Sequence, residues 1–238
     1  MQSNDVQKDK RQLIEMSSST AFTIGRTVGI LLLLQLIGAL TLPFILAKPI
    51  TMGSPAFLIS GVVHAFQIRL AVLLTFFGGA LTVFLGIMAF REFQRYSKTI
   101  ALLFVVVCAI SCVLDIVHAA TIMSLLSLSN SFNSSAAAES GLYRVVGAAA
   151  ASSRRAAHIN QLVAIGAWMF VFYFSLLRFK LVPRFLGAIG IIGILSQFVG
   201  VTFMMFMGYH IIGEMAMPLL PIQIAVSVWL MVRGFKSD

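Results

Sequence analysis

The sequence predicts an all-α fold, a polytopic transmembrane helical bundle of about six spans with both termini in the cytoplasm. The chain has 238 residues, of which 59% are hydrophobic and only 11% are charged, and its mean hydropathy is +0.98. Soluble domains usually have about a quarter of their residues charged. The charges are also segregated, and they leave apolar stretches of the roughly 20 residues that a helix needs to cross the hydrocarbon. Short basic segments, such as REFQRYSK and FKLVPR, separate these stretches.

The chain divides into a polar cytoplasmic tail over residues 1–22 and a single transmembrane domain over residues 23–238. The first span is expected at about 25–47 and is uncharged from Thr27 onward. Its apolar core is too long for a signal-peptide core, so a signal-anchor helix is the better interpretation. A loop with prolines and a glycine follows it.

The second and third spans are expected at about 66–90 and 99–126, on either side of the basic turn REFQRYSK. The third is longer than a bilayer requires, which predicts tilt or protrusion. A Ser- and Ala-rich outer loop is then predicted over 127–155, with room for one short helix.

The last three spans are expected at about 156–177, 183–207 and 215–235. Pro183 suits the first turn of the fifth span, where a missing N–H leaves no hydrogen bond unmade. The glycines and serine of the fifth span predict close helix packing. They are Gly187, Gly190, Gly193, Ser196 and Gly200.

The distribution of basic residues sets the expected orientation. Twelve of the 17 Lys and Arg residues fall on the side that holds both termini: Lys8, Lys10, Arg11, Arg26, Arg91, Arg95, Lys98, Arg178, Lys180, Arg184, Arg233 and Lys236. The other five are Lys48, Arg69, Arg144, Arg154 and Arg155. Because cytoplasmic loops carry the excess of Lys and Arg, both termini are predicted inside.

This topology gathers the polar side chains in the outer half of the bundle. The four histidines, His64, His118, His158 and His210, fall there with Asp115, Glu214, Arg69, Arg154 and Arg155. On the third span a polar stripe recurs every three or four residues: Cys108, Ser111, Cys112, Asp115 and His118. Ionisable side chains at the centre of a span cost about 2.5–3.5 kcal/mol, so they normally face the interior and have a partner.

Arg69 is the obvious partner for Asp115, because it enters on the adjacent antiparallel helix at comparable depth. One interpretation is therefore a buried Arg69–Asp115 ion pair that sets helix register. A second is a pocket for a substrate or ligand, formed by Arg69, Asp115, His118 and His158 and extended by the two residues Gln161 and Arg155. Glutamines and a serine nearer mid-membrane favour interhelical hydrogen bonds over a transport path. They are Gln35, Gln197, Gln223 and Ser227.

A metal site is a third interpretation. Imidazole and carboxylate are zinc ligands, and the candidates are Asp115, His118, His158, His210 and Glu214. No HExxH motif is present. A haem held by two of the histidines is a further alternative on the same grounds, less favoured than zinc. Cys108 and Cys112 are four residues apart on one helix, which is too rigid for normal disulfide geometry, so they are expected to be packing residues.

Several function classes are excluded. There is no P-loop, no glycine-rich dinucleotide fingerprint and no GxSxG, and no basic–aromatic pattern supports nucleic-acid binding. The basic excess, 17 Lys and Arg against 8 Asp and Glu, flanks apolar segments and therefore points to lipid headgroups. The expected partners are membrane lipids and a small-molecule or lipid ligand, and a homo-oligomer stays open.

The final third of the chain carries a family pattern. YFSLLRFKLVPRFLGAIGIIG and LPIQIAVSVWLMVRGF, with IGRTVGILLLL in the first span and Arg69 at the head of the second, resemble a bacterial membrane family called domain of unknown function 4386. The resemblance covers the layout of residues 23–236 and is most specific at Val182–Gly187 and Trp229–Phe235. It implies a helical bundle in a prokaryotic cytoplasmic membrane and implies no activity.

Three functions follow as hypotheses. The first is a non-enzymatic membrane protein that binds or moves a small molecule or lipid through an outward-facing polar pocket. The second is a zinc-dependent intramembrane hydrolase, since Asp115 and the histidines are similar to the metal-binding residues of ceramidase-like membrane hydrolases. The third is a structural or partner subunit with a register-setting ion pair.

Overall fold

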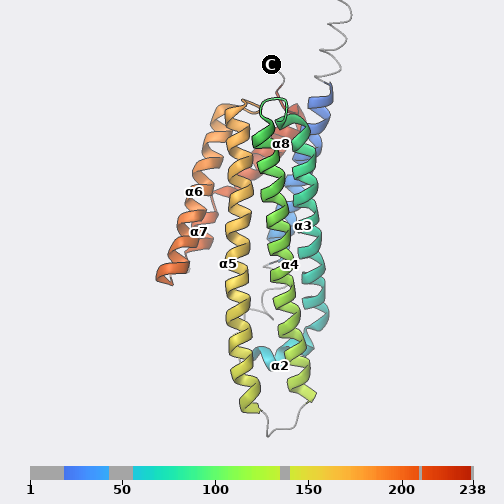
Figure 1. Ribbon diagram of the computed structural model, residues 1–238, viewed down its shortest axis with the longest axis vertical. Coiled ribbons are helices and arrows are strands. Elements are labelled where there is room, and N and C mark those ends of the chain that lie inside the picture. Colours follow the sequence, from blue (N-terminus) through green and yellow to red (C-terminus); the bar gives the residue numbers. More distant parts are fainter. Residues whose placement is uncertain (1–18, 43–55, 135–139, 209–210, 237–238) are drawn as a thin grey trace, which may run out of the picture.

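The computed structural model describes residues 19–42, 56–134, 140–208 and 211–236, and these form a bundle of helices with no β-strand in the described ranges (Figure 1). The first helix is Ser19–Leu42. The others are α2 (Ala56–Val63), α3 (Ala65–Phe93), α4 (Lys98–Ser134), α5 (Ser140–Arg178), α6 (Arg184–Met207), α7 (Ile212–Ala216) and α8 (Leu219–Arg233). The predicted all-α class is confirmed.

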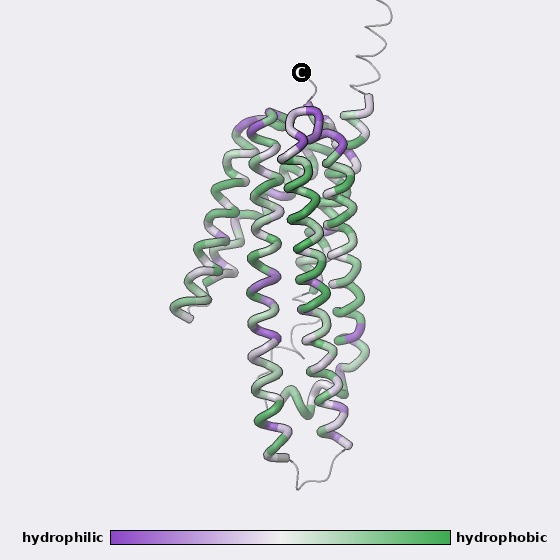
Figure 2. The backbone as a smooth tube through the Cα atoms, in the orientation of Figure 1, coloured by the Kyte–Doolittle hydropathy of each residue, from purple (hydrophilic) through white to green (hydrophobic). Residues whose placement is uncertain are grey.

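Within the described residues, six helices are long and apolar enough to cross a membrane. They are the first helix, α3, α4, α5, α6 and the segment Gly213–Arg233, which contains α8. Figure 2 shows apolar residues along most of their length and hydrophilic residues at the turns. The protein is therefore a multi-pass membrane protein, as the sequence predicts.

The start of the first helix, the α3–α4 turn, the α5–α6 turn and the end of α8 lie at one end of the bundle (Figure 1). We call this the basic end, because Arg95, Lys98, Arg178 and Lys180 are located there, and the opposite end the distal end. The arrangement agrees with an even number of crossings. That the basic end faces the cytoplasm stays a prediction from the charge distribution.

The outer loop predicted over 127–155 is wrong, because helices fill it on both sides of residues 135–139, which lie outside the described residues. Alanine has the highest helix propensity, and the Ala-rich segment before Arg154 continues α5. Residues of the distal end also pack together, since the Phe132 and Tyr143 rings lie 5.8 Å apart edge to face. The Ser129 hydroxyl donates to the Leu58 carbonyl of α2 over 2.8 Å.

Helices α4 and α5 consequently exceed any bilayer. They have 37 and 39 residues, which at 1.5 Å per residue corresponds to about 56 and 58 Å. The hydrocarbon core is only about 30 Å thick. The pair is therefore longer than a crossing requires, and Figure 1 shows the paired green and yellow helices reaching farther toward the distal end than the other spans.

Two other boundaries differ from the prediction. The first helix begins at Ser19, before the expected 25–47 span, and residues 43–47 lie outside the described residues. The last span is divided into α7 and α8, with Met217 and Pro218 between them. Proline has no N–H for the helical ladder, which explains a break at this point.

The ends of the chain meet at the basic end through glycines of the first helix. A Cβ at Gly25 would lie 2.6 Å from the Gly234 carbonyl carbon, and one at Gly29 would lie 2.7 Å from the Ser227 carbonyl oxygen. Only glycine permits such close approach of two helix backbones. The first helix is therefore fixed against α8, and this contact positions one wall of the site described next.

Candidate functional site

A chain of hydrogen bonds joins α4 to α5 near the middle of the two helices. Gln161 donates from Nε2 to Oδ1 of Asp115 over 2.6 Å, and its Oε1 lies 3.1 Å from Nδ1 of His158. A carboxylate only accepts hydrogen bonds, which orients the amide, so Oε1 must accept and His158 Nδ1 must donate. The i,i+3 spacing of His158 and Gln161 on α5 places both on one helix face.

His118 continues this cluster. It is buried one turn from Asp115, and its ring centroid lies 5.0 Å from that of His158 with an interplanar angle of 34°. Both ring nitrogens of His118 are buried and find no hydrogen-bond partner among the described residues, and the same holds for Nε of Arg154. The predicted polar stripe on α4 does face inward, since Cys108, Ser111, Asp115 and His118 are all buried.

Arg69 is not part of the cluster. Its side chain is on the exposed face of α3, and among the described residues the ion pair within 4.0 Å is Arg95–Glu92, at 3.1 Å near the basic end. Asp115 is instead bonded to Gln161, so the expected Arg69–Asp115 pair is wrong. Arg155 is likewise exposed. Arg69 is also at a different depth, because the α3 residue that faces Asp115 is Gly79, where a Cβ would lie 3.2 Å from Oδ2. Ten residues of helix separate the two positions, which corresponds to about 15 Å.

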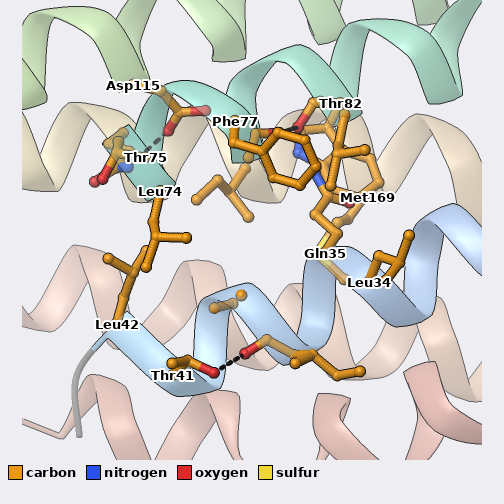
Figure 3. Close-up of a pocket in the computed structure, with 18 of the residues that line it drawn as sticks. Leu34, Gln35, Thr41, Leu42, Leu74, Thr75, Phe77, Thr82, Asp115 and Met169 are labelled. Carbon is orange, nitrogen blue, oxygen red and sulfur yellow. Dashed lines mark hydrogen bonds between the residues drawn. The ribbon is translucent and has the colours of Figure 1, made fainter. Parts of the chain in front are cut away.

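A cavity of about 360 Å³ lies beside this cluster, between the first helix, α3, α4, α5 and α8 (Figure 3). Its apolar lining comprises Leu34, Ile37, Gly38, Ala39, Leu42, Leu74, Phe77, Gly78, Leu81, Ile165, Trp168 and Met169. Its polar lining comprises Gln35, Thr41, Thr75, Thr82, Asp115, Gln161 and Gln223. Small-molecule sites are typically cavities of about 300–1,000 Å³ with apolar walls and a few polar groups.

Several polar side chains of the cavity form hydrogen bonds between helices. Gln35 donates to the Thr82 hydroxyl, and Gln223 donates to the Leu32 carbonyl over 3.4 Å. Outside the cavity, Gln197 donates to the Leu162 carbonyl over 3.3 Å. The interhelical hydrogen bonds predicted for these three glutamines are thus confirmed, whereas the Ser227 hydroxyl, predicted with them, is buried and has no partner among the described residues.

Two buried polar atoms next to the cavity have no partner among the described residues, Gln35 Oε1 and Trp168 Nε1. A buried polar atom without a partner is unfavourable by about 1–3 kcal/mol, and most such atoms in proteins bind water or a ligand. Figure 3 shows Gln35 pointing toward Thr82 from the first helix, with Asp115 across the cavity. Sequence reasoning did not identify Trp168 or the first helix as part of a site.

The candidate metal ligands are only partly brought together. Asp115, His118 and His158 gather at the α4–α5 seam, but no three His, Cys, Asp or Glu side chains in the described ranges are placed to hold a metal ion. Glu214 is exposed on α7, and His210 lies outside the described residues. The zinc site stays an untested prediction.

The fold and cavity define a class, the multi-pass helical membrane proteins with an interhelical cavity in the transmembrane region. Residues 27–234 match the family described as Domain of unknown function (DUF4386). The match covers most of the chain, and the protein belongs to this family, as its VPR–Leu–Gly turn and WLMVRGF ending indicate. No curated protein and no solved structure matches the chain.

Proposed function

We propose that the protein binds, within the bilayer, a small amphipathic molecule or lipid whose apolar body fills the cavity and whose polar end meets Asp115 and Gln161. The observation that carries this proposal is the cavity of about 360 Å³ with apolar walls and a buried carboxyl at its side. Its volume is at the lower end of the range for ligand sites, which suits a small molecule or a single chain.

The polar end of the ligand should be a hydrogen-bond donor. Oδ1 of Asp115 already accepts from Gln161, and Oδ2 retains its lone pairs. Gln35 Oε1 is a second acceptor without a partner among the described residues. A hydroxyl or amine on an apolar body satisfies such acceptors, whereas an anionic group would be repelled by an ionised Asp115.

Access is from the lipid. Leu34, Ile37 and Phe77 line the cavity and are 46%, 53% and 59% exposed, so its mouth lies between the first helix and α3. This surface lies within spans and therefore faces acyl chains. A ligand that partitions into the membrane can enter there without crossing water.

Glycines on opposite walls offer a direct test. A Cβ at Gly38 or Gly78 meets nothing within 4 Å, so a leucine at Gly78 starts in open space and is expected to occupy part of the cavity. Ala80→Leu is the matched control, because Ala80 is exposed on the same helix. The probe is decanol, a hydroxyl on an apolar chain, with decane as its counterpart without a donor.

Thermal unfolding of the purified full chain in maltoside detergent is the measurement. We expect decanol to raise the Tm of wild type and of Ala80→Leu more than decane does, and to leave the Tm of Gly78→Leu unchanged. Native mass spectrometry should detect bound adducts in the first two proteins and none in the third. Equal effects of both probes on all three proteins would contradict the proposal.

A further inference from the structure

A second cavity, separate from the first, lies at the basic end between the α3–α4 turn and the end of α5. It is open, has a volume of about 470 Å³, and is lined by Tyr96, Ser97, Ile100, Arg178, Phe179 and Lys180. The floor is a stacked pair of rings, Tyr96 and Phe179, with centroids 4.9 Å apart and an interplanar angle of 14°. The cavity thus combines an aromatic floor with two cationic side chains.

The backbone at Lys180 is unusual. Among the described residues Lys180 alone carries a side chain at positive φ, 57°. Its N–H donates to the Leu177 carbonyl over 3.3 Å, and the Leu181 N–H donates to the Leu176 carbonyl over 3.1 Å. This pair of bonds is the Schellman motif, which ends helices and normally has glycine at the left-handed position.

A lysine in place of that glycine is a local conflict between backbone and side chain. Left-handed backbone is unfavourable for a residue with a Cβ, and residues held in such conformations cluster at functional sites. Here the residue in the left-handed conformation is Lys180, which lines the cavity together with Arg178, two residues earlier. Attraction to the helix dipole alone does not need Lys180, because Arg178 already lies in the last turn of α5.

The cavity is lined by residues of the turns that join consecutive spans. The spans end at Phe93 and Arg178 and begin at Lys98 and Arg184, so the turns between them lie at the membrane boundary. Basic pockets between helices at this level suit anionic headgroups. Arginine offers a planar fork of donors that matches phosphate oxygens, and lysine adds a point charge. The Ser97 hydroxyl accepts from the Ile100 N–H over 3.4 Å and can donate its own hydrogen to a ligand.

We propose that this cavity is a binding site for a phosphate group, held by Arg178 and Lys180 over the Tyr96–Phe179 floor. The phosphate comes from a lipid headgroup or from free phosphate. The site is independent of the proposed function of the first cavity, because the two share no lining residue.

The test follows thermal unfolding of the full chain in maltoside detergent, with three probes. Dioctanoyl phosphatidic acid carries a phosphate on a lipid, dioctanoylglycerol is the same lipid without phosphate, and inorganic phosphate has no lipid. We expect phosphatidic acid to raise the Tm of wild type and dioctanoylglycerol to leave it unchanged. An equal rise with inorganic phosphate assigns the site to free phosphate, and no rise with it assigns the site to a lipid headgroup.

The variants separate binding from folding. Lys180→Gly relieves the left-handed backbone, so its Tm without ligand should equal or exceed that of wild type, yet it should bind phosphatidic acid about tenfold or more weakly. Arg178→Lys keeps the charge without the fork and should also weaken binding. Arg184→Gln is the matched control, a basic residue of the same turn outside the cavity, and should bind like wild type.

Two results would overturn the proposal. One is the absence of any Tm rise in wild type with phosphatidic acid and with inorganic phosphate. The other is a variant pattern without specificity for the cavity. This pattern is either equal binding by Lys180→Gly and wild type or an equal loss of binding in Lys180→Gly and Arg184→Gln, because either outcome would mean that only the general surface charge attracts the phosphate.

Discussion

Asp115 of α4 accepts a hydrogen bond of 2.6 Å from Gln161 of α5, and this contact joins the two longest described helices beside the apolar cavity. The carboxyl is 7% exposed. A buried carboxyl needs such a partner, because transfer out of water without one is strongly unfavourable. The pair therefore both connects helices and holds a polar group at the cavity wall.

Removing the donor should destabilise the bundle. Gln161→Met keeps the side-chain length but leaves Oδ1 of Asp115 without this hydrogen bond, and we expect a loss of about 1–3 kcal/mol in the free energy of unfolding. Asn160→Met is the control at the neighbouring exposed position and should change it by less than about 0.5 kcal/mol. Reversible unfolding in mixed micelles measures both. Equal losses would show that the Gln161–Asp115 bond contributes nothing specific.

Adjacent glycines of α3 should respond oppositely to leucine. A Cβ at Gly79 would lie 3.1 Å from the Cys112 sulfur and 3.2 Å from Oδ2 of Asp115, whereas one at Gly78 meets nothing within 4 Å. Gly79→Leu should destabilise the protein by roughly 1–3 kcal/mol through overpacking. Gly78→Leu should be neutral or stabilising, because glycine is a poor helix former by about 1 kcal/mol. Similar Tm values for the two variants would contradict the described helix contact.

The contact between the two ends of the chain should tolerate no side chain. A Cβ at Gly25 would lie within 2.7 Å of backbone atoms of Gly234, which cannot rotate away as a side chain could. We expect Gly25→Ala to lower Tm and to speed proteolysis of the first helix. Gly38→Ala, where a Cβ meets nothing within 4 Å, is the control on the same helix. Wild-type proteolysis of Gly25→Ala would argue against this docking.

Thiol labelling in intact cells can check the orientation. Gln94 is exposed in the α3–α4 turn and Ser131 is exposed near the distal end of α4. In a background with Cys108 and Cys112 replaced by alanine, Ser131→Cys should react with a membrane-impermeant maleimide. Gln94→Cys should react only after permeabilisation, since the basic end is predicted to be cytoplasmic. The reverse pattern would invert the topology.

The spans could be predicted because length and hydropathy alone determine which segments dissolve in lipid. The helical segments beyond the bilayer could not be predicted, because a Ser- and Ala-rich sequence forms neither an apolar stretch nor a turn signal. Packing at the distal end decides the conformation of these segments. The inward stripe on α4 followed from its three- and four-residue spacing. The partner of Asp115 could not be predicted, because packing sets the depth at which α3 and α4 meet, and Gly79, not Arg69, is the α3 residue that faces Asp115.

The cavities lie beyond sequence reasoning for a different reason. A cavity remains wherever the side chains of neighbouring helices do not fill the space between those helices. Its size therefore depends on residues from separate parts of the chain. Gly38 and Gly78 carry no pattern that distinguishes them from Gly79 or Gly25, which pack tightly. Lys180 did carry a signal, because a lysine just after a helix and three residues before Pro183 occupies a place where glycine is common.

The docking of the first helix against the last has a consequence for how the protein is made. Gln223 and Leu32 are bonded although they are 191 residues apart, and the glycine face of the first helix meets α8, which is synthesised after all the other described helices. During translation the first helix must therefore stay in the membrane without this neighbour. The apolar cavity, whose lining includes Gln35 and Gln223, can form only after α8 has joined the bundle, so a chain truncated before α8 would lack this site altogether.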